Sequence, residues 1–252
     1  MDDNNRYGTR ERQEELLIML KRIDAFCRNH SISYSLAGGS LLGAIRHNGF
    51  IPWDDDVDIM VDRENLDRFL KAFHDFPNET PYFLNRYLWV YRIQEVDDTS
   101  EGLLRPTIDI FVLDHCPDSE IKRKFKTFVI KMLQGMMKIN PDYKDKGIVM
   151  KACVFVTHIL GKPFSDEFLF RIYDRISQLG NKESSKYVSA YDYPFSYLNR
   201  RYKSNFLEKY TTHQFEDVQL PITTEFDHYL TEHYGDYMTP PKEEERLSEH
   251  MR

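Results

Sequence analysis

Four carboxylates occur within five residues in the run Asp54-Asp55-Asp56-Val57-Asp58, which we call the acidic run. Like charges this close repel one another unless a cation or hydrogen bonds compensate them. Side chains of a strand alternate between its two faces, so Asp56 and Asp58 are expected to point the same way. Two carboxylates at the mouth of a buried strand suit Mg²⁺, which binds one or two carboxylates together with water and phosphate oxygens.

A further carboxylate, Asp109, lies between Ile108 and Ile110 in an apolar, β-branched run. An aspartate in such a run is unfavourable unless it is paired or bound to a metal. If its strand neighbours the strand that follows the acidic run, Asp109 joins Asp56 and Asp58, and three carboxylates can hold two divalent ions for an in-line phosphoryl displacement. The alternative for the acidic run is a solvated loop.

Gly38-Gly39-Ser40 stands between a predicted strand and a predicted helix. Glycines allow close approach of a ligand to the backbone, and a helix N-terminus favours anions such as phosphate. Ser40 is expected either to cap the helix or to bind a phosphate oxygen. Arg46 and His47 follow and can meet a phosphate or the acidic run, or can simply stabilise the helix C-terminus. A turn of this kind also occurs without any ligand.

Hydrophobic periodicity predicts the elements that position these residues. Helices are expected at Glu11–Asn29, Leu41–Arg46, Glu64–Phe76 and Ile222–Tyr234, and helical structure from Glu120 to about Gly180. Strands are expected at Ser33–Ala37, Val57–Val61, Tyr82–Leu84, Leu88–Ile93 and Thr107–Val112, with a turn at Asp97–Gly102. Residues from Lys186 onward are predicted to form mainly short irregular pieces.

This order predicts an α+β protein with a mixed sheet and flanking helices, followed by a mostly helical C-terminal part. We expect a catalytic core at residues 1–115 and a substrate-binding part at residues 116–252, with a soft boundary.

The composition narrows the possible functions. The chain has 34 Lys and Arg against 41 Asp and Glu, a formal net charge of −7, which does not favour a nucleic-acid binder. Three scattered cysteines indicate a reducing compartment rather than a disulfide framework. Neither a signal peptide nor an apolar run of transmembrane length is recognised. We therefore expect a protein of the bacterial cytoplasm, with peripheral contact to the inner membrane face as an alternative.

The stretch Tyr34–Val61, which contains both the glycine turn and the acidic run, resembles the signature of the LicD family. That family is related to fukutin and fukutin-related protein. Thr107–Leu113 resembles the middle segment of the family, and Tyr234–Met238 followed by Pro240-Pro241 resembles its closing motif. The resemblance spans nearly the whole chain, and residues 118–185 are the least similar.

The resemblance implies a nucleotidyltransferase-like fold, of the type seen in the core of DNA polymerase beta. In that superfamily the glycine turn, here Gly38, Gly39 and Ser40, binds the donor phosphate, and Arg46 is a candidate for the same role. The paired aspartates Asp56 and Asp58 bind Mg²⁺, with Mn²⁺ as an alternative.

A third aspartate on a neighbouring strand, here Asp109, completes the implied site and acts as metal ligand or proton acceptor. Asp54 matches an acidic position of the family without a separate role. The candidates for donor or acceptor binding are His47, Trp53, Asp54, Tyr234 and Asp236.

The implied activity is transfer of phosphocholine from CDP-choline to a sugar hydroxyl of a teichoic acid or lipopolysaccharide precursor, with release of CMP. Ribitol, glycerol or ethanolamine phosphate from the matching CDP donor is an alternative. A nucleotidyltransferase that uses a nucleoside triphosphate, and an inactive subunit that binds a CDP-alcohol or glycan, are two others.

Tyrosine-rich segments could receive the quaternary ammonium of choline, or could simply be core. Trp53 could stack on cytosine or pin its loop.

The basic segment Lys122–Lys126 precedes two apolar helical stretches. Basic and apolar helices can lie on anionic membranes, which suits a lipid-linked glycan acceptor. The alternative is a set of core helices with a solvated lysine edge.

Overall fold

The computed structural model describes residues 6–74, 76, 82–95, 106–141, 143–144, 146–181 and 185–246. These residues form two compact units. The first comprises residues 6–85, 91–112 and 205–246, and the second comprises residues 86–90 and 113–204, within the described ranges. These units describe only which residues pack together. The division into a catalytic core at residues 1–115 and a substrate-binding part at residues 116–252 therefore stays a prediction.

The sheet of the first unit has the strand order β1-β2-β5-β4-β3. Its strands are β1 (Ser35–Leu36), β2 (Val57–Asp62), β5 (Thr107–His115), β4 (Val90–Glu95) and β3 (Tyr82–Tyr87). β1 is antiparallel to β2, and β4 is antiparallel to β5. β2 and β5 are hydrogen-bonded neighbours, so the strand after the acidic run and the strand of Asp109 lie side by side, as the family resemblance implied. The α+β class with a mixed sheet and flanking helices is also confirmed.

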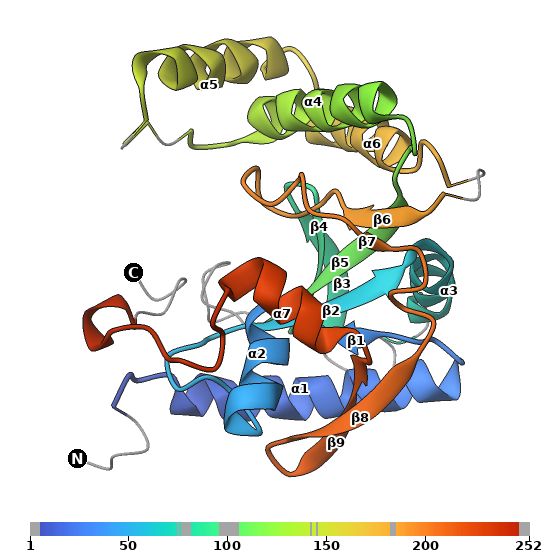
Figure 1. Ribbon diagram of the computed structural model, residues 1–252, viewed down its shortest axis with the longest axis vertical. Coiled ribbons are helices and arrows are strands. Elements are labelled where there is room, and N and C mark those ends of the chain that lie inside the picture. Colours follow the sequence, from blue (N-terminus) through green and yellow to red (C-terminus); the bar gives the residue numbers. More distant parts are fainter. Residues whose placement is uncertain are drawn as a thin grey trace. The chain divides into compact units, whose positions relative to one another are not determined.

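Four helices and a hairpin complete the first unit, as far as it is described. They are α1 (Arg10–Asn29), α2 (Gly38–His47), α3 (Arg63–Phe73), α7 (Phe226–Tyr234) and the hairpin of β8 (Tyr210–Phe215) and β9 (Val218–Thr223), with a short 3₁₀ turn, η4, at Glu243–Glu245. α1 buries the predicted apolar stripe, including Leu16, Leu20 and Ile23. α2 contacts β1, β2, β8 and α7, so elements far apart in sequence surround it (Figure 1).

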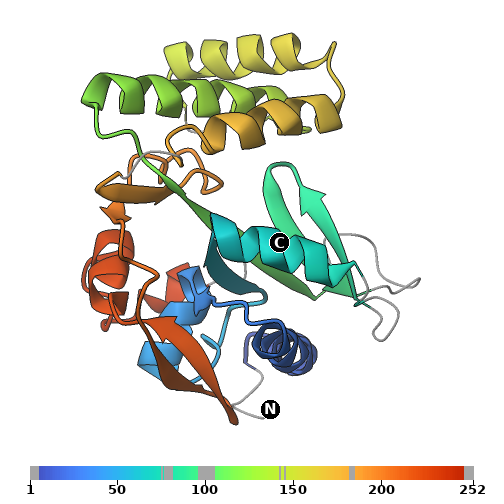
Figure 2. The same ribbon diagram turned by 90° about the vertical axis from the view of Figure 1, so that its right-hand side faces the viewer.

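The second unit contains the helices α4 (Glu120–Met137), α5 (Ile148–Gly161) and α6 (Asp166–Ser177). α4 packs against both of the others (Figure 2). β6 (Tyr187–Ala190) pairs antiparallel with the end of β5 and with β7 (Tyr202–Lys203). Lys126, one of the basic segment, is buried and donates to the carbonyls of His115, Ser177 and Leu179. It therefore stabilises the fold, because its ammonium satisfies carbonyls at the end of α6.

Several predicted boundaries were wrong. α2 includes Gly38 and Gly39 as its first residues, and α3 ends at Phe73 rather than Phe76. β4 begins at Val90 because Leu88, with φ of 57°, lies in the turn after β3. Ile222 belongs to β9, so α7 begins only at Phe226. The predicted turn at Asp97–Gly102 lies outside the described residues.

The strands β6 to β9 were not predicted from the sequence. The two-residue turn of the β8–β9 hairpin is Glu216-Asp217, which lacks the Asn-Gly or Asp-Gly signal of such turns. Glu216 adopts a φ of 53° there. Its backbone N–H donates to the Asn48 carbonyl, so contacts with the end of α2 compensate the unfavourable turn residue.

Among the described helices, none is both long and apolar enough to cross a bilayer by itself. α5 and α6 pass that test only as a pair, across a bend of 114°.

Candidate active site

The first turn of α2 lies directly against two carboxylates of the acidic run. A Cβ atom on Gly38 would lie 2.0 Å from Asp58 Oδ2, and one on Gly39 would lie 2.5 Å from Asp54 Oδ2. Gly38 also has a φ of 49°, a conformation that side chains disfavour. Glycine is therefore favoured at position 38 both by the backbone conformation and by the Asp58 carboxylate, and a side chain at position 39 would displace the Asp54 carboxylate.

Backbone bonds fix this turn to the neighbouring strand and to α7. The Ala37 N–H donates to the Asp58 carbonyl (3.0 Å), and the Gly38 N–H donates to the Tyr229 hydroxyl (2.9 Å). Ser40 is buried, and its Oγ accepts the Asp58 N–H (3.0 Å). In this structure Ser40 thus joins α2 to β2 instead of capping the helix.

Asp58 is the electrostatic centre of the site. Its pKa is raised well above its ordinary value of 3.8, first by burial and then by the charges of Asp56, Asp109 and Asp54. A hydrogen bond from the Gly39 backbone N–H opposes this rise. The positive end of the α2 dipole also faces this carboxylate. The carboxylates thus lie close enough to repel one another, and a bound cation would stabilise them.

Asp109 is held by a cation that the sequence did not reveal. Arg92, opposite it on β4, donates from Nε to Asp109 Oδ1 (2.6 Å) and from a terminal nitrogen to Oδ2 (2.8 Å). Both residues are buried. This two-bond pairing fixes the orientation of the Asp109 carboxylate.

A second arginine, Arg12 of α1, reaches the acidic run. Its Nε donates to the Asp55 carbonyl (2.6 Å), and the charges of Asp55 and Asp56 act on its guanidinium. The pKa of Arg12 is lowered below its ordinary value, because burial outweighs these charges. Arg12 and Arg92 therefore supply the positive charge that the acidic run itself lacks.

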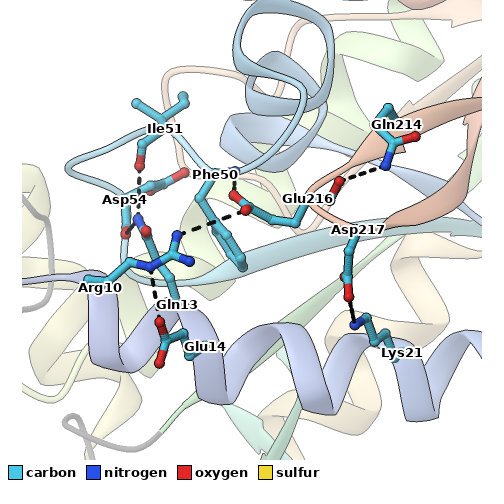
Figure 3. A network of polar contacts seen from close by, with 10 residues as sticks. All are labelled: Arg10, Gln13, Glu14, Lys21, Phe50, Ile51, Asp54, Gln214, Glu216 and Asp217. Carbon is cyan, nitrogen blue, oxygen red and sulfur yellow. Dashed lines mark hydrogen bonds and ion pairs between the residues drawn. The ribbon is translucent and has the colours of Figure 1, made fainter. Parts of the chain in front are cut away.

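α1 and the β8–β9 hairpin hold the loop that carries the acidic run (Figure 3). The Gln13 side-chain amide donates to the carbonyls of Ile51 (3.0 Å) and Asp54 (2.9 Å). Glu216 accepts the Phe50 N–H (3.1 Å) and lies 3.8 Å from Arg10. The position of Asp54 is thus determined by α1 and the β8–β9 hairpin, two elements that are far from it in sequence on either side.

A cluster of rings and cations surrounds Trp53, the residue before the acidic run. The Trp53 ring lies 5.6 Å from the Tyr7 ring and 6.4 Å from the His47 ring, edge to face. The Arg246 guanidinium lies 5.2 Å from its centroid. Burial, Arg46 and Arg246 lower the pKa of His47 below 6.5. The neutral ring then accepts the Arg46 Nε hydrogen (3.0 Å).

Arg46 binds the closing motif (Tyr234–Met238) to α2. One terminal nitrogen of Arg46 donates to the Tyr237 carbonyl (2.9 Å), and Tyr234 acts electrostatically on the same guanidinium. Asp236 is exposed and accepts a hydrogen bond from Thr239 (2.7 Å). The structure therefore brings Arg46, His47, Trp53 and Tyr234 together, whereas the Asp236 carboxylate pairs within its own segment.

The donor set suits a hard cation only in part. Within the described ranges, no group of three or more His, Cys, Asp or Glu side chains is arranged to hold a metal ion. Burial and the charges of Asp56, Asp109 and Asp54 nevertheless raise the pKa of Asp58, and a divalent cation beside Asp56 and Asp58 would offset this repulsion. Two carboxylates with the rest of the shell from water and substrate phosphates are enough for Mg²⁺.

Sequence reasoning missed Arg12 and Arg92, and it missed the contact of Tyr229 with Gly38. Arg92 carried a weak signal, since it is a lone cation in the strand-like run Val90-Tyr91-Arg92-Ile93. The contact of Tyr229 had no signal, because it joins residues 191 positions apart.

Residues 31–175, which contain the glycine turn, the acidic run and Asp109, match the family of LicD/FKTN/FKRP nucleotidyltransferase domains. The chain belongs to this LicD family and is a phosphotransferase of the LicD type.

The chain is also similar to one known protein over nearly the full length of both chains. The chain is 30% identical over 264 aligned residues to the lipopolysaccharide cholinephosphotransferase LicD of Haemophilus influenzae, covering 96% of each protein. Shorter matches of 35% and 34% identity, over 72 and 67 residues, occur with uncharacterized proteins of Rickettsia typhi and Rickettsia prowazekii. These cover 28% and 25% of this chain, and 23% and 25% of those proteins.

Proposed function

We propose that this protein transfers phosphocholine from CDP-choline to a sugar hydroxyl of a lipopolysaccharide or teichoic acid type precursor and releases CMP. One observation carries the proposal: the relationship to the Haemophilus influenzae lipopolysaccharide cholinephosphotransferase extends over 96% of both chains. The parts that would select donor and acceptor are therefore aligned along with the acidic run.

We also propose a nucleotidyltransferase-like fold for the unit that carries the site. The helix that opens with Gly38 and Gly39 packs beside the Asp58 carboxylate of β2, and β2 neighbours β5, which is consistent with that fold. A cytoplasmic location is proposed as well, and it is supported by the three cysteines, which are all free thiols.

Asp56 and Asp58 are the residues that would hold Mg²⁺. When bound, the ion would neutralise charge on the diphosphate and on the leaving oxygen. In this structure the Gly38 and Gly39 N–H groups donate to Tyr229 and Asp58. The positive dipole of α2 lies on the same side, which favours the binding of a donor phosphate.

The transfer forms a bond between the acceptor oxygen and the phosphorus that bears choline. It breaks the bond from that phosphorus to the oxygen bridging to CMP, which leaves with the electron pair. The acceptor hydroxyl gives its proton to a carboxylate, and Asp109 is our candidate for this role. Arg92 acts as a positioning residue, since it holds both Asp109 oxygens.

The cluster around Trp53 is our candidate for recognition of the cytidine or choline part of the donor. The indole face can stack on a base or attract a quaternary ammonium. Arg246 and Arg46 supply positive charge next to it, which suits a nucleotide phosphate better than choline.

The test is to identify the leaving group. Purified protein is incubated with Mg²⁺, a lipopolysaccharide acceptor and, in separate reactions, CDP-choline, CDP-ribitol, CDP-glycerol, CDP-ethanolamine or nucleoside triphosphates. Release of CMP from CDP-choline with labelled acceptor supports the proposal. CMP from another CDP-alcohol changes the transferred group, pyrophosphate indicates a nucleotidyltransferase, and binding without turnover indicates an inactive subunit.

A matched pair of variants connects any turnover to the site. Asp58→Asn should reduce transfer on the order of 10²–10³-fold, as loss of a charge-stabilising group does. Asp67→Asn changes an exposed aspartate of α3 and should leave transfer unchanged. Equal activity of Asp58→Asn and wild type would rule out the metal assignment.

A further inference from the structure

Helix α5 (Ile148–Gly161) exposes its large apolar residues and buries two small residues. Ile148 is 87% exposed, Val149 78% and Phe155 54%, and Val156, Ile159 and Leu160 are also exposed. The buried residues of this helix are Thr157 and Gly161. A helix in contact with water normally shows the reverse pattern, and an exposed apolar patch of this kind marks an interaction surface.

Small residues determine which way α5 faces. A Cβ on Gly135 of α4 would lie 2.4 Å from Thr157 Oγ1, and one on Gly161 would lie 2.1 Å from the Met136 carbonyl oxygen. The two helix backbones therefore approach closely at this point. A bulkier face of α5 cannot occupy the same place, so its apolar side is held outward.

α4 extends the same surface. Ile121, Phe125 and Phe128 are 82%, 68% and 60% exposed and lie three or four residues apart, on one face of the helix. Gly135 follows Phe128 by two helical turns and lies on that face, so α5 covers the end of this stripe. Figures 1 and 2 both show α5 on the side of α4 that faces away from β6.

The segment that carries this surface is basic in a protein that is acidic overall. Residues 120–162 contain ten Lys or Arg, of which Lys126 is buried, and three Asp or Glu, whereas the whole chain has a net charge of −7. Lys122 and Lys124 flank the α4 stripe, Lys151 lies in α5 and Lys162 directly follows it, and all four are exposed. Apolar residues bordered by lysines are the pattern of a helix that lies in a membrane interface.

We propose that the exposed α4–α5 face (Ile121, Phe125, Phe128, Ile148, Val149, Phe155, Val156, Ile159 and Leu160) binds the surface of a bilayer that contains anionic phospholipids. The lysines contact the headgroups and the apolar side chains enter the boundary of the acyl region. α5 has 14 residues and is roughly 21 Å long, shorter than the ~30 Å hydrocarbon core, so it lies along the interface and does not span it.

A second copy of the chain fits this face less well. A symmetric dimer would bring the same basic segment of each copy together, and these like charges would repel. Anionic lipid headgroups instead complement the lysines. The inference is independent of the proposed reaction, since it concerns residues outside the acidic run and the glycine turn.

The test is flotation of the full-length protein with vesicles of phosphatidylcholine alone, or with about a third phosphatidylglycerol. We expect binding to the anionic vesicles that weakens in high salt. Phe155→Glu should reduce the partition coefficient about tenfold or more, because it places a carboxylate in the interface. Ile18→Glu changes an equally exposed apolar residue of α1 and should bind like wild type.

Circular dichroism checks that each variant is folded, which is expected because Phe155 and Ile18 are exposed in the structure. Lys122→Glu combined with Lys124→Glu tests the electrostatic part separately and should also reduce binding. The proposal is overturned if wild-type protein does not float with anionic vesicles, or if Phe155→Glu floats as well as wild type. A dimer that Phe155→Glu dissociates, seen by light scattering without vesicle binding, would equally overturn it.

Discussion

Replacing Gly38 with alanine tests the contact between the glycine turn and the acidic run. At a φ of 49° an L-residue costs about 1–2 kcal/mol. The new Cβ would lie 2.0 Å from Asp58 Oδ2, so that the carboxylate must move. The carboxylate then loses the hydrogen bond from the Gly39 N–H. A hydrogen bond to a charged group contributes about 1.5–3 kcal/mol. We expect Gly38→Ala to lower the free energy of unfolding by about 2.5–5 kcal/mol.

A double-mutant cycle with Asp58→Ala separates the two contributions. Without the carboxylate, the nearest atom of residue 58 to the new Cβ is its own Cβ, at 3.3 Å, which is tight but tolerable. Only the backbone cost then remains, so the coupling energy between the two substitutions should be about 1.5–3 kcal/mol. Gly147→Ala is the control, because a Cβ there meets nothing within 4 Å.

The assay is urea denaturation of the metal-free protein, followed by turnover in Mg²⁺. Gly38→Ala should also lose transfer activity, since the displaced carboxylate belongs to the proposed metal site. Additive effects of Gly38→Ala and Asp58→Ala, to within about 0.5 kcal/mol, would refute the reasoning. So would a Gly38→Ala protein as stable as the control.

Three other predictions follow from the same structure. Arg92→Ala leaves the buried Asp109 carboxylate unpaired and should lower the free energy of unfolding by about 3–5 kcal/mol in urea; a loss below 1 kcal/mol would contradict the pairing. Because the pKa of Asp58 is raised above 3.8, folded metal-free protein binds that proton more tightly than the unfolded chain. The contribution of Asp58 to the free energy of unfolding should therefore be greatest below pH 3.8. It should be lost as the pH rises through the pKa that Asp58 has in the folded protein. Asp58→Asn should flatten this dependence in EDTA, and an unchanged slope would show that another group causes it. Cys153 is exposed, whereas burial raises the pKa of Cys27 to about 12, so a thiol reagent at pH 8 should modify Cys153 rapidly and Cys27 only after unfolding, as mass spectrometry of the labelled peptides can show.

Local pattern was sufficient for much of the first unit. The apolar spacing of α1 and the β-branched runs of β2 and β5 predicted these elements, because each needs only one buried face and a period of 3.6 or 2 residues. These runs left open whether β2 and β5 are neighbours; the family resemblance implied it, and it is observed. The hairpin β8–β9 was missed because its turn residues are unfavourable by themselves and are stabilised by the end of α2.

The candidate site shows the same division. The acidic run and the glycine turn were found from the sequence, since both are contiguous. The pairing of Arg92 with Asp109 depends on the register of β4 against β5, and strand register is not set by either strand alone.

The direction in which α5 faces is a second feature that the sequence did not determine. Its composition predicted an apolar helix beside lysines, but a helix that is apolar on most sides gives no preference for which side is buried. The close contact of Thr157 and Gly161 with α4 decides it.

The sequence alone thus determined which chemical groups this protein has, and which of them are adjacent, because neighbours in the chain stay neighbours in the fold. Only the tertiary structure decided that Gly38 lies against Asp58 and Tyr229, that Arg92 holds Asp109, and that α5 is apolar on its outer side. Each of these is a contact between residues far apart in sequence. Such contacts form only when whole elements pack, and their energies depend on burial that no local stretch of sequence contains.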